Sequence, residues 1–503
     1  MVKKELYDYQ KEDLETIMTC LNEKPSDYNL LYQLPTGGGK TVIFSEIARR
    51  YSAETGKKVM ILTHRIELCK QTSNMLDEFG VKNKIINSEV KELPEQDKYT
   101  CFVAMVETLN NRLNEEDIII EGIGLVIIDE AHYNSFRKLF KYFEDCFILG
   151  VTATPLSSNV KLPMKDTYQE LILGNSIPKL VQKGYLAKST TYNYNVKLGM
   201  LKIGSNGDYT VKSSDLLYSN ADMLNKLIAA YEERAKGKKC LIFNSGIATS
   251  RQVYEAFEKA GYNARHLDST HSKQQRIETI EWFRKEPDAI LSSVGILTTG
   301  FDEPSVETII LNRATKSITL YFQMIGRGSR VLPNKKTFDI IDMGNNSARF
   351  GLWDEAMDWQ SIFLQPDFYY DNLISDEEIE RHFKYIMPDD LRAKFANSTN
   401  IDFDVAEENK KALARGEKSK AVLDASIEQH ANMCVDNSED VFDARILMKL
   451  LEDDIMDRIR HYCYCITNST KNYKAWLLED YKLKLRRLIA KKMKDMAPVD
   501  TSE

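Results

Sequence analysis

Leu34–Thr41, with the sequence Leu-Pro-Thr-Gly-Gly-Gly-Lys-Thr, joins a strand-like run over residues 28–33 to a helix-like run over residues 42–51. Three consecutive glycines allow backbone N–H groups to turn inward around a phosphate chain, next to the partial positive charge of a helix N-terminus. In such a loop Lys40 reaches the terminal phosphates and the hydroxyl of Thr41 binds Mg²⁺. The stretch begins with leucine where the usual motif has its first glycine, so a glycine-rich turn without a ligand is the alternative.

Two acidic residues follow a second strand-like run. Residues 124–128 are mostly apolar and lead directly into Asp129 and Glu130. Carboxylates at the carboxyl end of a central parallel strand lie at the edge where open α/β sheets bind ligands. We expect Asp129 to hold Mg²⁺ and Glu130 to orient and deprotonate the attacking water. The alternative is a pair of acids that caps the next helix.

Further strand ends and a pair of arginines occur in the second half of the first 345 residues. The turn over residues 298–302 carries a glycine and an acid, and residues 323–330 carry Arg327 and Arg330. On a helix this spacing of three would place both guanidinium groups on one face. There both could donate paired hydrogen bonds to a triphosphate as arginine fingers. The alternative is a basic turn whose arginines are solvated.

Seven short blocks occur in an order that is typical of one family. They are residues 9–10, 35–41, 63–68, 129–132, 152–154, 299–302 and 323–330. Together they resemble the motifs of superfamily 2 helicases and translocases of the DEAH-box type. Residues 183–186, 297–304 and 321–328 look most like the RadD-type branch, which is close to the motor subunits of type I and type III restriction systems.

The resemblance implies an α/β fold with two RecA-like parallel-sheet lobes in tandem and a mostly helical C-terminal domain. The first lobe would span residues 1–186, and a connecting segment would span 187–220. The second lobe would span 221–348, and a helical accessory domain 349–503. At 503 residues the chain is long enough for this number of domains.

The resemblance also implies ATP and Mg²⁺ in the cleft between the lobes, with roles for individual residues. The catalytic residues would be Lys40, Asp129, Glu130, Gln323, Arg327 and Arg330. The nucleotide-binding residues would be Tyr9, Gln10, Pro35, Thr36, Gly37, Gly38, Gly39, Lys40, Thr41, Gly300 and Asp302, and the metal ligands Thr41 and Asp129. Coupling of nucleotide state to lobe closure would fall to His132, Thr152 and Thr154 together with Gln323, and contact with nucleic acid to Arg65, Thr108 and Thr299.

Composition excludes several other classes of protein. The net charge of −7 argues against a protein that coats nucleic acid by bulk electrostatics, although a motor needs only a local basic groove. No apolar run approaches the roughly 20 residues of a membrane span, so we expect no membrane partner. The eight cysteines are scattered, which is typical of the reducing cytoplasm.

The tail after residue 350 carries charge but none of the seven blocks. Residues 351–440 have about twelve excess acids, and residues 471–494 have about seven excess bases. We interpret the basic stretch as an amphipathic helix that either binds nucleic acid or a partner, or docks its apolar face internally. A zinc cluster at residues 461–465 and a nuclease-like pattern over residues 388–410 are both expected to be chance matches.

The predicted function is that of an ATP-dependent DNA helicase or translocase, coupling hydrolysis to movement on DNA in repair, recombination or replication. DNA is the expected partner, and residues 351–503 are a candidate surface for a protein partner. The alternatives are an RNA helicase, the motor subunit of a restriction complex, or a scaffold that uses ATP only as a switch. The presence of Lys40, Glu130, Arg327 and Arg330 disfavours the scaffold.

Overall fold

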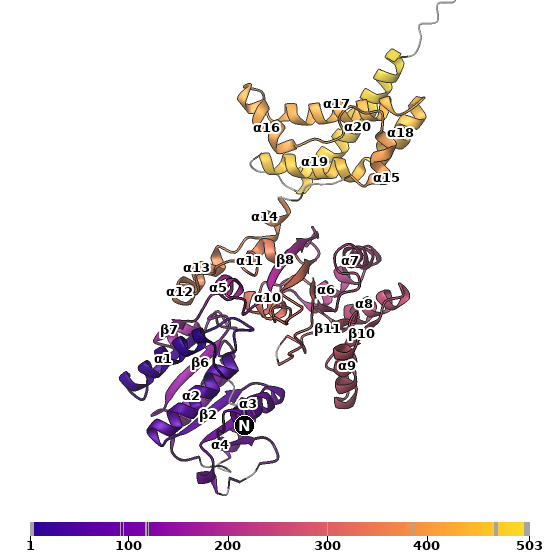
Figure 1. Ribbon diagram of the computed structural model, residues 1–503. Coiled ribbons are helices and arrows are strands. Elements are labelled where there is room, and N and C mark those ends of the chain that lie inside the picture. Colours follow the sequence, from indigo (N-terminus) through magenta and orange to yellow (C-terminus); the bar gives the residue numbers. More distant parts are fainter. Residues whose placement is uncertain are drawn as a thin grey trace, which may run out of the picture. The chain divides into compact units, whose positions relative to one another are not determined.

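The computed structural model describes residues 5–90, 92–93, 95–115, 118, 120–298, 300–381, 383, 387–466 and 471–496. The chain divides into two compact units, Met1–Asp376 and Glu377–Glu503 (Figure 1). The first unit contains two parallel sheets, and the second is built from helices. None of the described helices is long and apolar enough to cross a membrane.

The first sheet has seven strands in the order β3-β4-β2-β5-β6-β1-β7. Its strands are β1 (Asn29–Gln33), β2 (Lys58–Thr63), β3 (Asn83–Ile86), β4 (Cys101–Met105), β5 (Ile123–Asp129), β6 (Phe147–Thr152) and β7 (Glu170–Leu173). The pairings of β1, β2 and β5 with their neighbours are parallel, and these apolar strands are buried on both faces. The carboxyl ends of β1 and β5 therefore open on the same edge of the sheet.

Helices cover both faces of this sheet, as two separate apolar clusters show. The elements are α1 (Asp8–Glu23), α2 (Lys40–Thr55), α3 (Ile66–Glu78), η1 (Gln96–Lys98), α4 (Val106–Asn114), η2 (Asn134–Tyr142), η3 (Met164–Asp166) and α5 (Ile177–Gln182). Leu14 of α1 and Ile43 of α2 pack with Ile61 on one face. Leu109 of α4 and Phe136 of η2 pack on the other. Successive strand side chains thus enter opposite clusters, as Leu30 and Leu31 of β1 do, and α2 packs on the same face as α1.

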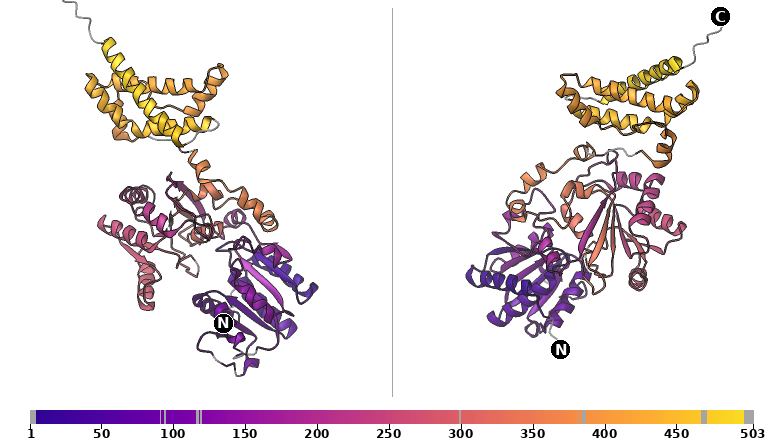
Figure 2. Two further views of the ribbon diagram at one scale, coloured as in Figure 1. Left: turned by 180° about the vertical axis from the view of Figure 1, so that it is seen from behind. Right: turned by 45° about the horizontal axis from the view of Figure 1, so that its top comes forward.

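The second sheet has six strands in the order β10-β11-β9-β12-β13-β8. Its strands are β8 (Lys188–Asn193), β9 (Cys240–Asn244), β10 (Ala264–Leu267), β11 (Ile290–Ser293), β12 (Thr308–Asn312) and β13 (Thr337–Asp342). Helices lie on both sides of the strands (Figure 2). They are α6 (Val211–Tyr218), α7 (Ala221–Arg234), α8 (Ile247–Lys259), α9 (Lys273–Lys285), α10 (Ile318–Ile325) and α11 (Asn346–Phe350). The edge strand β8 lies within the stretch that the sequence assigns to a connecting segment.

Helix α9 differs from its predicted packing in one respect. The pattern of the sequence places Ile277, Ile280 and Phe283 on a common inner face, and Phe283 is fully buried as expected. Ile277, however, is 43% exposed. Its side chain lines an open groove between the two lobes instead of the core, so this part of the prediction was wrong.

The aromatic segment after the second sheet packs on both lobes and not on the second lobe alone. It includes α12 (Trp359–Leu364) and α13 (Pro366–Asp371). Trp359 contacts Phe322 of α10, with ring centroids 5.6 Å apart. Phe363 belongs instead to the apolar cluster of the first lobe, and Lys165 donates a hydrogen bond to the carbonyl of Leu364 at 2.9 Å. The segment therefore ties the two lobes together.

The second unit is a bundle of helices with its own apolar core. After α14 (Asp376–Arg381) its elements are α15 (Asp389–Arg392), η4 (Ala393–Phe395), α16 (Val405–Ala414), α17 (Lys420–Asp436), α18 (Val441–Leu450), α19 (Glu452–Cys465) and α20 (Lys471–Met496). Leu477, Tyr481, Leu485 and Ile489 of α20 are buried at four-residue intervals, so the basic helix docks its apolar face internally. Residues 401–404, inside the nuclease-like pattern, form no strand, and Val405 begins α16.

A buried polar network ties three helices of this bundle together. The Tyr481 hydroxyl lies 2.8 Å from His430 Nδ1, and His430 Nε2 lies 2.7 Å from Asp454 Oδ2. Arg458 Nη2 contacts the same carboxylate oxygen at 2.8 Å and supplies its counter-charge. Burial disfavours a second positive charge here, and together with Arg458 it lowers the pKa of His430 to about 4.

Acidification should therefore destabilise the second unit. The pKa of His430 is about 6.5 in the unfolded chain and about 4 in the folded chain. The contribution of neutral His430 to the free energy of unfolding is therefore fully present above pH 6.5 and declines as the pH falls toward 4. The loss should reach about 3 kcal/mol. Hydrogen exchange of peptides from α17 in the full chain, measured at pH 7.5 and pH 5, checks this. A His430→Gln variant should show a weaker pH dependence, and an unchanged dependence would contradict the assignment.

Candidate nucleotide site and interlobe groove

The glycine stretch forms a tight loop between β1 and α2. Gly37 and Gly39 have φ values of +96° and +86°, a region that favours glycine because other residues have a Cβ there. The Gly38 carbonyl accepts hydrogen bonds from the Tyr9 hydroxyl at 2.6 Å and from Gln10 Nε2 at 3.1 Å. The first residues of α1 thus brace the loop. Lys40 begins α2, and its Nζ lies 3.5 Å from the carbonyl oxygen of Leu34.

The acid pair lies at the carboxyl end of β5, beside this loop. Asp129 and Glu130 are both buried, and the backbone N–H of Glu130 donates to Asp129 Oδ1 at 3.0 Å. Burial and the neighbouring Glu130 raise the pKa of Asp129, while the charge of Lys40 opposes this shift. Glu130 has φ +54°, a strained backbone for a residue with a side chain. Such strain is typical of residues held in place at functional sites.

The donor set of this edge fits a hard cation and a phosphate chain. Asp129 supplies a carboxylate and Thr41 a hydroxyl at the start of α2, which are the oxygen ligands that Mg²⁺ prefers. Thr36 Oγ1 and Glu130 Oε2 are buried and have no hydrogen-bond partner within the described residues. Buried polar atoms without partners are rare in folded proteins and point to a missing ligand.

A chain of polar contacts leads from Glu130 to the second lobe, and its links from His132 onward are hydrogen bonds. His132 Nδ1 lies 3.4 Å from Glu130 Oε2 and 3.1 Å from Thr152 Oγ1. The Thr152 hydroxyl donates to the Thr154 carbonyl at 3.0 Å. The Thr154 hydroxyl in turn is hydrogen-bonded to that of Thr319 on α10, at 2.8 Å. Three of the four predicted coupling residues, His132, Thr152 and Thr154, therefore form one connected path between the lobes.

The two arginines follow α10 and do not lie on one helical face. The helix ends at Ile325, because Gly326 and Gly328 disfavour its continuation, so the predicted helical placement was wrong. Arg330 Nε is paired with Asp302 at 2.8 Å, and its Nη1 is buried without a hydrogen-bond partner in the described part of the chain. A Cβ added to Gly37 would lie 2.5 Å from this Nη1.

The guanidinium of Arg327 is bound by backbone carbonyls of its own lobe. Its guanidinium donates to the carbonyls of Phe301 at 2.5 Å and Thr298 at 2.6 Å. Burial and the nearby charge of Arg330 lower the pKa of Arg327 to about 10, while Glu130 acts in the opposite direction. Gln323, also buried on α10, has an Nε2 with no partner among the described residues. The second lobe thus carries buried donors without partners among the described residues, and one of them, Nη1 of Arg330, lies at the loop.

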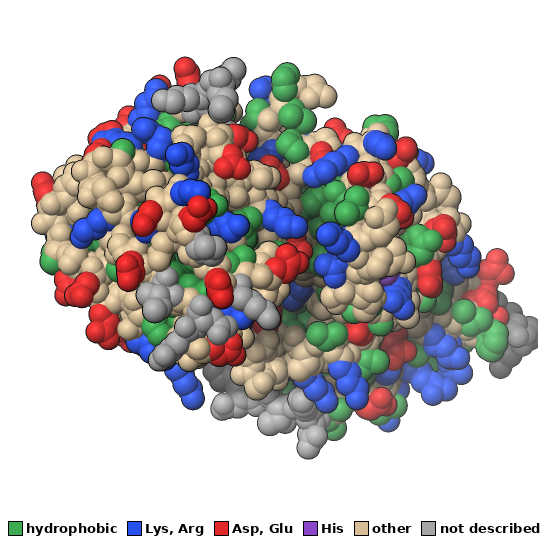
Figure 3. Space-filling model, turned by 90° about the horizontal axis from the view of Figure 1, so that it is seen from below, with side chains coloured by type: hydrophobic (Ala, Val, Ile, Leu, Met, Phe, Trp, Pro, Cys, Tyr) green, Lys and Arg blue, Asp and Glu red, His purple; other side chains and the backbone are tan. Residues whose placement is uncertain are grey.

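An open groove of about 1020 Å³ lies between the lobes. Figure 3 shows basic side chains on both sides of the hollow where the lobes meet. The lining includes the basic residues Arg65, Lys70, Lys273 and Arg276. The lobes also touch here, since Arg65 Nη1 donates to the Ile296 carbonyl at 3.4 Å and Gln71 Nε2 to the Gly300 carbonyl at 2.6 Å.

One predicted nucleic-acid contact lies outside this groove, and another lies outside the described residues. Thr108 lies on α4 and does not line it, and Thr299 lies outside the described residues. Gly300 lines the groove, while Asp302 is exposed and pairs with Arg330. Of the three predicted nucleic-acid contacts, Arg65 is the one that the structure brings to the groove.

Comparison with known proteins accounts for both lobes. Residues 3–157 match the family model "Type III restriction enzyme, res subunit", and residues 219–331 match "Helicase conserved C-terminal domain". The chain belongs to the superfamily 2 helicases. The two matched regions contain the loop with the acid pair and the two arginines, respectively.

Individual relatives of this helicase support the same placement. It is 29% identical over 337 residues to a 51.5 kDa protein of Lactococcus phage (isolate 7-9), covering 66% of this chain and 69% of that protein. It is 27% identical over 363 residues to the putative ATP-dependent helicase IRC3 of Saccharomyces cerevisiae, covering 67% of this chain but 51% of that protein. The DNA-bound Type ISP restriction-modification enzyme LlaBIII has a similar fold, with a TM-score of 0.53 and 14% identity over 99% of this chain and 44% of that enzyme.

The helicase site also contains residues that the sequence did not reveal. Thr319, the partner of Thr154, lies in the first turn of α10, and no spacing rule identifies it. Arg276 is the fourth residue of α9, and the sequence predicts no role for it. Tyr185 packs against Tyr9 and Tyr7, with ring centroids 4.9 and 4.6 Å away, and forms an aromatic cluster at the start of α1.

Proposed function

We propose that this superfamily 2 helicase is an ATP-driven motor that moves on DNA, in repair, recombination or replication. The observation that carries the proposal is the approach of Arg330 Nη1 from the second lobe to Gly37 in the loop of the first. A buried guanidinium with an unsatisfied donor at a phosphate-binding loop is suited to stabilise charge on a transferred phosphoryl group. The ATP site would then be complete only when the lobes are closed.

Each residue of the site would have a distinct role in hydrolysis. Backbone N–H groups of the glycine loop and Lys40 would bind the phosphates, and Thr41 and Asp129 would hold Mg²⁺. The metal, when bound, neutralises charge on the phosphates. Glu130 would accept the proton of the attacking water, for which its buried position beside His132 is suited. Gln10, at the edge of the loop, would contact the adenine.

Closure of the lobes would be linked to the bound nucleotide through the path from Glu130 to Thr319. A change at Glu130 alters the partners of His132, and through Thr152 and Thr154 it reaches α10, which directly precedes the arginines. Hydrolysis would thereby change the contact between the lobes. Opening and closing of two lobes on a bound strand is a general means of stepwise movement.

The interlobe groove would bind the backbone of the nucleic acid. Its basic residues come from both lobes, so a bound strand would be gripped by two bodies that move relative to each other. A DNA track is supported by the restriction-enzyme res subunit model and by the DNA-bound enzyme of similar fold. RNA is the second candidate, since the groove contacts described here would also suit an RNA backbone.

Replacement of Arg65 tests the groove. Arg65→Ala should weaken binding of single-stranded DNA to a similar degree for different sequences, and it should reduce the salt slope of the binding constant by about one. Fluorescence anisotropy over a range of salt concentrations measures both quantities. Arg50→Ala is the matched control, because Arg50 lies on α2 and is paired with Glu15 at 2.5 Å. An Arg65 variant that behaves like this control would exclude Arg65 from the track.

The second unit would bind a partner that loads or regulates the motor. Such a role is in keeping with a restriction-type assembly, which is the other form that this motor could take.

We place the protein in the cytoplasm, in line with the free thiols of Cys69, Cys101 and Cys240 in the core.

A further inference from the structure

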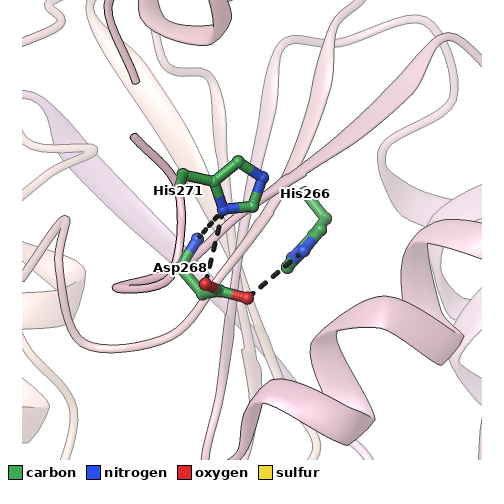
Figure 4. A group of neighbouring side chains, drawn as sticks. All are labelled: His266, Asp268 and His271. Atoms are coloured by element: carbon green, nitrogen blue, oxygen red, sulfur yellow. Dashed lines mark hydrogen bonds and ion pairs between the residues drawn. The ribbon is translucent and has the colours of Figure 1, made fainter. Parts of the chain in front are cut away.

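Two histidines and an aspartate meet at the carboxyl end of β10. His266 and Asp268 end the strand region, and His271 lies in the turn before α9. Both imidazole rings approach the carboxylate of Asp268 from different sides (Figure 4). His266 Nε2 lies 3.3 Å from Oδ2, and His271 Nδ1 lies 3.4 Å from Oδ1.

The carboxylate is buried and only half satisfied. Asp268 has no exposed surface, and its Oδ1 accepts hydrogen bonds from the backbone N–H and the hydroxyl of Thr270, both at 2.6 Å. Its Oδ2 has no hydrogen bond within the described residues; His266 Nε2 faces it, and Arg251 Nη2 lies 3.9 Å away, beyond hydrogen-bond distance. A buried anionic oxygen without a donor is costly, and the usual remedies are a partner charge or a metal ion.

From this geometry we propose that His266, Asp268 and His271 bind one divalent transition-metal ion of the zinc class. Two nitrogens and one oxygen form a donor set that zinc accepts, with ligand bonds of about 2.0–2.2 Å, so that tetrahedral ligands lie about 3.3–3.5 Å apart. Each imidazole nitrogen lies at about this spacing from one oxygen of the Asp268 carboxylate, His266 Nε2 from Oδ2 and His271 Nδ1 from Oδ1. All three donor atoms lie within 4.8 Å of one another.

The surroundings hold the donors in place before any ion arrives. Ser250 Oγ lies 3.5 Å from Nδ1 of His266, which leaves the other ring nitrogen to face the carboxylate. Arg276 clamps the turn, donating to the carbonyls of Ser269 at 3.0 Å and His271 at 3.1 Å. Outer hydrogen bonds of this kind orient the ligands of metal sites.

The site borders the interlobe groove, which suggests its purpose. His271 and Arg276 both line the groove. An ion at this position would fix the turn between β10 and α9 and leave a fourth coordination position on the side of the partly exposed His271. The ion would thus set the shape of one wall of the groove. This inference does not depend on the ATP site or on the proposed track.

Metal titration of the full chain, freed of metal with a chelator and kept without nucleotide, tests the proposal. Zn²⁺ should bind with a stoichiometry of one by calorimetry and should raise the melting temperature. Co²⁺ at the same site should give visible absorption bands of a nitrogen- and oxygen-bound ion without thiolate charge-transfer bands. Absence of binding, or a thiolate spectrum, would overturn the proposal.

Variants localise the ion. His271→Gln and Asp268→Asn should each abolish the stoichiometric binding and the shift in melting temperature. Two control variants should leave the binding and the melting-temperature shift unchanged. His461→Gln alters a histidine of the second unit that lies near two cysteines in the sequence, and Asp129→Asn alters the acid pair. Because His271 lies in a partly exposed turn, its variant is expected to fold, and circular dichroism checks this. Retention of binding by a folded His271→Gln variant, or loss of binding in either control, would refute the assignment.

Discussion

Arg330→Ala should lower the turnover number for ATP hydrolysis by about 10³- to 10⁵-fold, the range known for arginine fingers. The reason is geometric. Arg330 comes from the second lobe, its Nε is held by Asp302, and its buried Nη1 has no partner among the described residues and lies at the glycine loop. Affinity for ATP should change much less, because the loop, Lys40 and Thr41 all belong to the first lobe. Steady-state hydrolysis and equilibrium nucleotide binding separate the two effects.

The control for this variant retains charge but not shape. Arg330→Lys keeps one positive charge but loses the planar guanidinium, which can bind Asp302 and a phosphate at the same time. This variant should therefore recover only a small part of the hydrolysis rate. Arg251→Ala, a surface arginine of α8, should have little effect on hydrolysis. If Arg330→Ala hydrolyses ATP at the normal rate, the second lobe does not complete the site as we propose.

Glu130→Gln should reduce hydrolysis by about 10²- to 10⁴-fold, the contribution of a positioned general base. Glutamine has nearly the same shape, so the strained backbone at φ +54° and the packing beside His132 should be preserved. ATP binding should persist, and the variant should accumulate in the nucleotide-bound state. Single-turnover hydrolysis and nucleotide binding by calorimetry measure these two outcomes.

An exposed carboxylate provides the matched control for the Glu130 variant. Glu107→Gln removes one acid on α4, where Glu107 pairs with Lys138 at 2.5 Å, and should leave hydrolysis unchanged. A Glu130→Gln variant that retains its rate would show that another group activates the water. A loss of ATP binding in that variant would instead mean that Glu130 acts through the nucleotide pocket.

The local geometry of the first lobe could be predicted because each of its features obeys a short-range rule. The loop at residues 34–41 needs glycines for its positive φ angles, and the acids at residues 129–130 follow a continuous apolar strand. Both patterns depend on neighbours in the sequence. The parallel sheets follow in turn from the alternation of strand-like and helical runs.

The contacts between the lobes could not be predicted in the same way. The bond between Thr154 and Thr319 joins residues that are 165 positions apart, and neither residue is distinctive alone. The arginines were assigned to a helix by their spacing, but Gly326 and Gly328 end α10 before them. Ile277 follows the apolar period of α9 and yet lines a groove. Such outcomes depend on tertiary packing, which local spacing does not encode.

The central claim is tested most directly by steady-state ATP hydrolysis with no polymer, single-stranded DNA, duplex DNA, forked DNA and RNA. We expect one of the DNA forms to stimulate hydrolysis strongly, and the stimulation should be lost in Arg330→Ala. Stimulation by RNA alone would retain the motor but contradict the proposed track. Hydrolysis that is indifferent to every polymer would contradict the account of a nucleic-acid motor.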